Sequence, residues 1–156
     1  MLSFVQSEDE LDVAGPLREV CQSIGVVPAP HRTTAQRVRS LVTSPLPDMA
    51  MRLPSPKFHE ELKLYLERED PDVVQVEGIE LAQYGLALAG NRAGHRPILV
   101  FDDHNAEYVL QRRAFETDLR RPRQWAGAAY SWVQWHRLAR YEGCLLYTSP
   151  SPRDRS

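Results

Sequence analysis

Four short apolar segments, separated by segments with helical periodicity, constrain the fold of this chain most. The apolar segments are residues 2–5, 26–27, 73–76 and 98–101. Runs of this length between turn residues indicate strands. Strands that alternate with helices predict an α/β fold in which right-handed crossovers join parallel strands. We therefore expect a Rossmann-like, three-layer arrangement, with helices on both faces of a parallel sheet and strands buried on both sides.

Helix signals fill the intervals between these apolar segments. A capping box at residues 7–10 and Pro16 predict a first helix that ends at Gly25. Thr34 is expected to cap a helix with Val38, Leu41 and Val42 on its apolar face. Further helices are predicted from Pro56, over residues 79–89, around residues 108–110 and over residues 125–141. Residues 45–56 contain four prolines and predict a loop with little regular structure.

Composition limits the class of protein. The chain has 156 residues with 42% hydrophobic residues and a formal net charge of −2, which fits one globular domain and offers no electrostatic case for nucleic acid. No apolar stretch approaches the roughly 20 residues that span a bilayer, and no leader pattern is evident. We therefore expect a cytoplasmic location, with peripheral contact at the inner face of the membrane left open.

The last residues resemble an artefact. Residues 144–154 match the translation of a transposase-type sequencing adaptor, so we expect residues 144–156 to be a non-native tail. A natural disordered tail is the alternative. If residues 144–156 are a translated adaptor, residues 1–143 are an incomplete domain, and we expect the natural protein to continue beyond Gly143. Whether Met1 is the true start is left open.

Polar residues cluster after the two strands predicted last. Glu77-Gly78-Ile79-Glu80 follows the first, and residues 102–107, Asp-Asp-His-Asn-Ala-Glu, follow the second. Neighbouring parallel strands place such clusters at one edge of the sheet, where ligands bind in open α/β sheets. The helices that follow would point their positive ends at this edge and favour an anionic ligand. We predict His104 as the catalytic residue, with Glu77, Gly78, Asp103, Asn105 and Glu107 binding substrate.

Plainer interpretations stand beside this one. Asp102 or Asp103 would serve equally well as a helix N-cap, and His104 as a loop residue. A metal site is disfavoured because the consecutive acids and histidine point in different directions. The arginines at 112–113 and 120–123 are interpreted as a solvated helix face in preference to a contact with phosphate or acidic lipid headgroups. Dinucleotide-binding, Walker and nucleophile-elbow motifs are absent.

Residues 101–107, with 72–77 upstream and 138–142 downstream, resemble the N-terminal domain of glycosyltransferase family 4 enzymes. Residues 2–4, with Leu17, Cys21 and residues 26–28, are similar to the corresponding part of members linked to exopolysaccharide biosynthesis. The resemblance implies one half of a GT-B fold, built from two Rossmann-like domains. It implies transfer of a sugar from a nucleotide-sugar donor to a glycan or lipid-linked acceptor, with retention of configuration and without a cofactor or metal. The N-terminal domain would bind the acceptor, with His104 at the sugar and phosphate end of the cleft.

This sequence departs from the family pattern in two places. The usual first strand and glycine-rich loop are missing or lie before Met1, and the donor-binding domain is not among these 156 residues. We therefore expect a transferase when full length and an inactive chain as it stands. The competing interpretations are a flavodoxin-like binding or receiver-type regulatory domain and a metal-dependent hydrolase. The receiver interpretation needs a later lysine, and lysine occurs only at 57 and 63.

Overall fold

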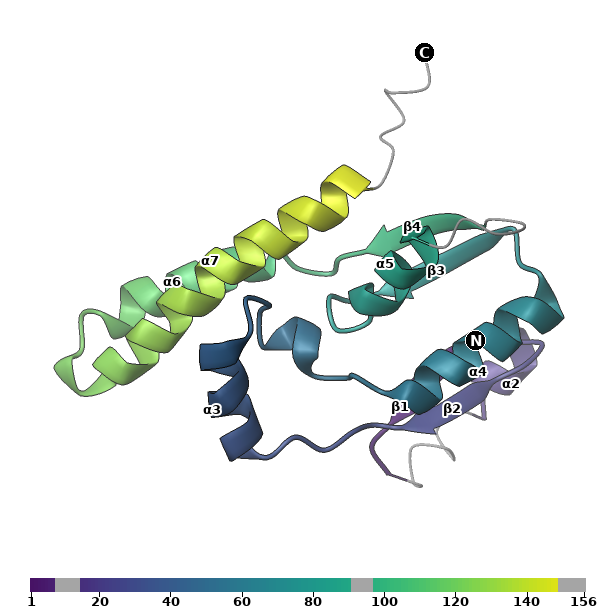
Figure 1. Cartoon of the computed structure of the whole chain (residues 1–156), viewed down its shortest axis with the longest axis horizontal. Helices are drawn as coiled ribbons and strands as arrows, with labels where there is room; N and C mark the ends of the chain where they lie inside the picture. Colours follow the sequence, from purple (N-terminus) through teal and green to yellow (C-terminus); the bar gives the residue numbers. More distant parts are fainter. Residues whose placement is uncertain (8–14, 91–96, 149–156) are drawn as a thin grey trace, which may run out of the picture.

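The computed structural model describes residues 1–7, 15–90 and 97–148, in which strands and helices alternate along the chain (Figure 1). The strands are β1 (Leu2–Val5), β2 (Gly25–Pro28), β3 (Val73–Glu77) and β4 (Ile98–Asp102). The α-helices are α2 (Leu17–Val20), α3 (Thr34–Thr43), α4 (Pro56–Glu69), α5 (Ala82–Gly90), α6 (Glu107–Asp118) and α7 (Trp125–Thr148). Two 3-10 turns are η1 (Met49–Met51) and η2 (Pro122–Gln124). The predicted α/β class is confirmed.

The strands pair in parallel, as predicted, but as two separate two-stranded sheets. β1 pairs with β2, aligning Phe4 with Val27, and β3 pairs with β4, aligning Val76 with Phe101. Figure 1 shows the two sheets apart, with α4 between them. The three-layer, Rossmann-like sheet is therefore not confirmed over the residues described.

The prediction that the strands are buried on both sides is wrong for β3 and β4. Val73, Ile98 and Val100 are 51%, 56% and 42% exposed, whereas Val76 is only 9% exposed. The register places the exposed residues on one face, since side chains alternate along a strand. α5 packs on this sheet so closely that a Cβ on Gly85 would lie 3.1 Å from Val76 Cγ2. The apolar runs thus form a sheet with one covered face.

Two apolar clusters form the core, and α5 lies between them. The first joins both strands of the β1–β2 sheet to α4 and Tyr84, with the Phe4 and Phe58 rings stacked at 4.3 Å between centroids. The second joins Ile79 and Ala82 to Leu138 and Leu145 of α7. Because Tyr84 belongs to one cluster and Ala82 to the other, α5 connects the two sheets.

Helix starts follow the sequence signals at α4 and less closely elsewhere: the helix predicted over residues 79–89 is α5, which begins at Ala82. Ser55 caps α4 by accepting from the Phe58 N–H at 3.2 Å, as Pro56 predicted. The cap of α3 is Thr33 and not Thr34, in a capping box with Gln36. The predicted apolar face of α3 is not buried: Val38 and Val42 are 58% and 81% exposed. The predicted capping box at residues 7–10 lies mostly outside the described residues. The helix predicted to follow Pro16 is present as α2, but its predicted end at Gly25 is wrong, because α2 ends at Val20 and Gly25 begins β2.

The proline-rich segment contains η1 and a buried carboxylate, Asp48, which is 7% exposed. Arg32 and Arg37 contact its two oxygens at 3.1 and 2.9 Å. The Asp48 N–H donates to Gln134 Oε1 of α7 at 2.8 Å. Arg137 of α7 also donates to the Leu41 carbonyl at 2.7 Å. These bonds tie the loop and α3 to α7, so the predicted loop is more ordered than its prolines indicated.

α6 and α7 form a helical hairpin whose turn lies away from both sheets (Figure 1), while the C-terminal half of α7 packs in the core. α6 ends before Pro122, as predicted, but α7 continues past the predicted end at residue 141 to Thr148. Leu145, 5% exposed, is packed in the core. No described helix combines the length and apolarity needed to cross a membrane.

Candidate functional site

The ends of β3 and β4 lie side by side, as the sequence predicted. Glu77 aligns with Asp102, the last residue of each strand. Gly78 then adopts a φ of +82°, a conformation that glycine accepts without a Cβ clash, and its N–H donates to the Asp102 carbonyl at 3.0 Å. The turn at Gly78 keeps Glu80 close to the strand ends: a Cβ on Gly78 would lie 3.3 Å from Glu80 Oε2.

Asp103, Asn105 and Glu107 come together beyond β4. The Asp103 carboxylate accepts from the Asn105 backbone N–H, and the Asn105 side chain hydrogen bonds with Glu107. Desolvation raises the pKa of Asp103, and the charges of Asp102 and Glu80 raise it further. The hydrogen bond from the Asn105 N–H and the charge of His104 lower it in part. Desolvation also raises the pKa of Glu107, with Glu80 and Asp103 adding to the shift. These carboxyls therefore favour the protonated form more than free carboxyls do.

Glu80, a member of the polar segment predicted after β3, and Arg52, which no sequence pattern indicated, extend this group. Arg52 Nη1 lies 3.3 Å from Glu80 Oε1. The Arg52 charge lowers the pKa of Glu107, opposing the effect of the neighbouring acids. Arg52 comes from the proline-rich segment, so no local sequence signal linked it to the strand ends. Arg52 therefore offsets part of the repulsion at Glu107, as His104 does at Asp103.

Glu142 of α7 also reaches this group and was also missed. It is 5% exposed, and its Oε1 accepts from the Tyr108 N–H at 3.0 Å. Desolvation raises its pKa to about 7; the Tyr108 N–H opposes this shift, and Asp103 and Glu107 add to it. The spacing of residues along α7 could have indicated Glu142. It lies four residues after Leu138 and three before Leu145, on the buried face of the helix.

We call Glu80, Asp103, Glu107 and Glu142 the carboxylate cluster. Its members come from four places in the chain: the turn after β3, the loop after β4, the start of α6, and α7. Carboxylates accept hydrogen bonds, and Glu142, whose pKa is raised to about 7, also donates one when it is protonated. The cluster is therefore suited to a neutral ligand rich in hydroxyl groups and unsuited to a bare phosphate.

His104 and Glu77 are exposed, as is Asp103 of the cluster, whereas Glu80, Glu107 and Glu142 are at least partly buried. The His104 side chain is 59% exposed, and its Nδ1 lies 3.6 Å from Asp102 Oδ1. Glu77 lies on the exposed sheet face, where its Oε1 accepts from Gln75 Nε2 at 3.3 Å. Both residues flank the strand ends, with side chains available to a ligand.

The helix-cap interpretation of Asp102 and Asp103 is not supported by the geometry. The N-cap of α6 is Ala106, with no side-chain cap bond, so neither Asp102 nor Asp103 caps that helix. Within the described ranges, no group of three or more His, Cys, Asp and Glu side chains is arranged to hold a metal ion.

Comparison of the chain with protein-family models, curated proteins and solved structures found no match.

Proposed function

We propose that this chain is the acceptor-binding, Rossmann-like half of a retaining glycosyltransferase with a GT-B fold. The carboxylate cluster beside the paired ends of β3 and β4 carries the proposal. Carboxylates and amides accept hydrogen bonds from sugar hydroxyls, and protonated carboxyls donate to them. An acidic rim also disfavours phosphates, as expected for an acceptor side whose donor is held elsewhere.

Each predicted residue has a role in this proposal. Asp103, Asn105 and Glu107 bind acceptor hydroxyls, and Glu77 borders the same edge. Gly78 keeps the backbone free of a side chain at the turn. His104, exposed beside Asp102, is the hydrogen-bond partner of the transferring sugar or of a donor phosphate. The nucleotide-sugar donor is bound mainly by a second domain outside these 156 residues.

The genomic locus gives the first test. Reading the DNA past the codon for Gly143 should show a second Rossmann-like domain that contains two glutamates eight residues apart. A stop codon or an unrelated domain at that place contradicts the proposal.

Binding by the chain itself gives a second test. Saturation-transfer difference NMR with a panel of neutral oligosaccharides should show contact that Glu107→Ala abolishes. Glu60→Ala, an exposed change on α4, is the matched control and should leave the contact unchanged.

In the protein that includes the donor domain, His104→Ala should reduce sugar transfer without lowering the melting temperature. Unchanged turnover removes His104 from the mechanism.

A further inference from the structure

The turn between α6 and α7 exposes arginines beside large apolar residues. Every residue from 119 to 127 is exposed, including Leu119 at 54% and Trp125 at 60%. Trp125 Nε1 donates to the Leu119 carbonyl at 3.3 Å, which holds the indole ring against the turn. We name Leu119, Arg120, Arg121, Arg123 and Trp125 the hairpin tip.

The charge at the hairpin tip is not neutralised. Among the residues described, Arg120, Arg121 and Arg123 form no ion pair, whereas Glu116 is already paired with Arg112 at 2.8 Å. Residues 112–125 contain five arginines and two acids, a net charge of +3 in a chain whose total is −2. The positive charge is therefore local, and it is concentrated at one end of the hairpin.

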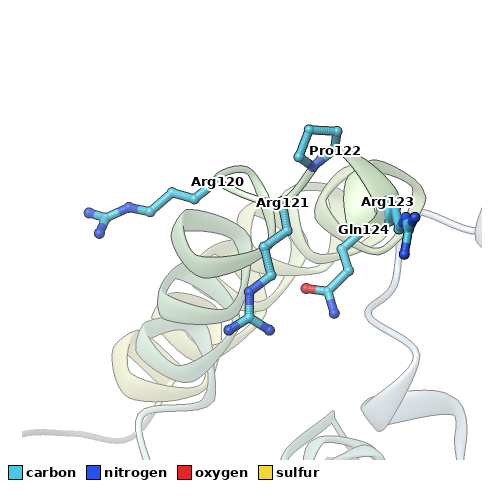
Figure 2. A pocket seen from close by; sticks show the side chains of 5 residues that line it. All are labelled: Arg120, Arg121, Pro122, Arg123 and Gln124. Atoms are coloured by element: carbon cyan, nitrogen blue, oxygen red, sulfur yellow. The ribbon is translucent and has the colours of Figure 1, made fainter.

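The shape of the hairpin tip suits a broad surface. Figure 1 shows it at the end of the hairpin farthest from the sheets. Arg120, Arg121, Pro122, Arg123 and Gln124 line an open hollow of about 500 Å³. In Figure 2, Arg121 and Gln124 extend on the same side of the turn, while Arg120 extends in another direction. Guanidinium and amide groups on one side of a hollow suit the oxygens of a phosphate headgroup.

We propose that the hairpin tip docks on an anionic lipid surface. Arginines near such a surface are attracted by its negative potential. Tryptophan places its apolar ring and its N–H at the level of the headgroups, and Leu119 would enter the acyl boundary beside it. Nucleic acid would also attract the arginines, but it gives an exposed leucine no apolar environment. This proposal does not depend on the proposed transferase function.

Vesicle flotation tests the docking directly. The wild-type chain should float with vesicles of phosphatidylglycerol and phosphatidylcholine, and not with phosphatidylcholine alone. The triple variant Arg120→Gln, Arg121→Gln, Arg123→Gln should lose about 10-fold or more in partitioning. Trp125→Ala should reduce partitioning to the vesicles several-fold, although it leaves the charge unchanged. Circular dichroism of each variant shows that the helices remain.

The matched control is Arg18→Gln, Arg39→Gln, Arg140→Gln, three exposed arginines outside the hairpin tip. It removes the same charge and should keep wild-type partitioning. Equal losses in both triple variants overturn the proposal, as does wild-type binding to neutral vesicles at the same level. Binding to a short DNA duplex without binding to vesicles also overturns it, in favour of nucleic acid.

Discussion

Glu142 Oε1 accepts a hydrogen bond from the Tyr108 N–H at 3.0 Å, so α7 supplies the acceptor that the first turn of α6 lacks in its own sequence. This bond fixes the end of α7 to the segment that carries Asp103 and Glu107. The same carboxyl is buried beside other acids, which raises its pKa to about 7 from an ordinary value of 4.5.

We predict that Glu142 makes the stability of the chain dependent on pH. Between pH 4.5 and 7 the folded chain keeps a proton that the unfolded chain has released, so the free energy of unfolding falls as pH rises through this window. Glu142→Gln keeps an acceptor for Tyr108 and carries no charge. At pH 8 the free energy of unfolding of this variant should be roughly 1–3 kcal/mol higher than that of wild type. At pH 4 the difference should be small.

Urea titrations at several pH values measure this effect. Glu60→Gln, an exposed change on α4, is the control and should follow the wild-type pH profile. Parallel pH profiles for wild type and Glu142→Gln would show that Glu142 ionises normally.

Arg52 should control the ionisation of Glu107. Its charge lowers the pKa of Glu107, so Arg52→Gln should raise that pKa further. The shift is followed by NMR titration of the side-chain carboxyl carbon. Arg68→Gln removes a cation that pairs with Glu69 on α4 and should leave Glu107 unaffected. An unmoved Glu107 titration in Arg52→Gln contradicts the arrangement.

Replacement of two glycines by alanine should change the stability of the chain in opposite directions. Gly78 has a φ of +82°, so Gly78→Ala should destabilise the chain by about 1–2 kcal/mol. Gly143 lies within α7, where an added Cβ would meet nothing within 4 Å. Gly143→Ala should therefore stabilise the chain by about 0.5–1 kcal/mol. Thermal unfolding of the pair measures both effects, and equal signs would disprove the backbone assignment at one of them.

Asp48 should be among the most sensitive positions outside the apolar core. Asp48→Asn removes the charge that two arginines share and should cost about 3 kcal/mol. The comparison is Asp72→Asn, an exposed position between α4 and β3, with an expected change below about 0.5 kcal/mol. Equal losses for Asp48 and Asp72 would show that the ion pairs contribute little.

Local signals predicted local structure well. The Ser55–Pro56 start of α4, the four strands and the end of α6 before Pro122 were all readable from neighbouring residues. The number of sheets was not, because strand pairing depends on contacts far apart in sequence. Exposure of Val73 and Ile98 was missed for the same reason: an apolar run does not reveal which helix covers it.

The candidate site was predictable in part. The pairing of Glu77 with Asp102 followed from both lying at strand ends. Arg52 and Glu142 were not found, since each reaches the strand ends from an element whose position only the tertiary fold determines.

The placement of α5 between the two apolar clusters has a consequence for folding cooperativity. One helix of nine residues packs toward Phe58 through Tyr84 and toward Leu138 through Ala82. Neither sheet is wide enough to stabilise itself alone. Loss of α5 would expose apolar surface in both clusters at once, so amide exchange in β1–β2 and β3–β4 should proceed through one shared opening rather than two independent ones.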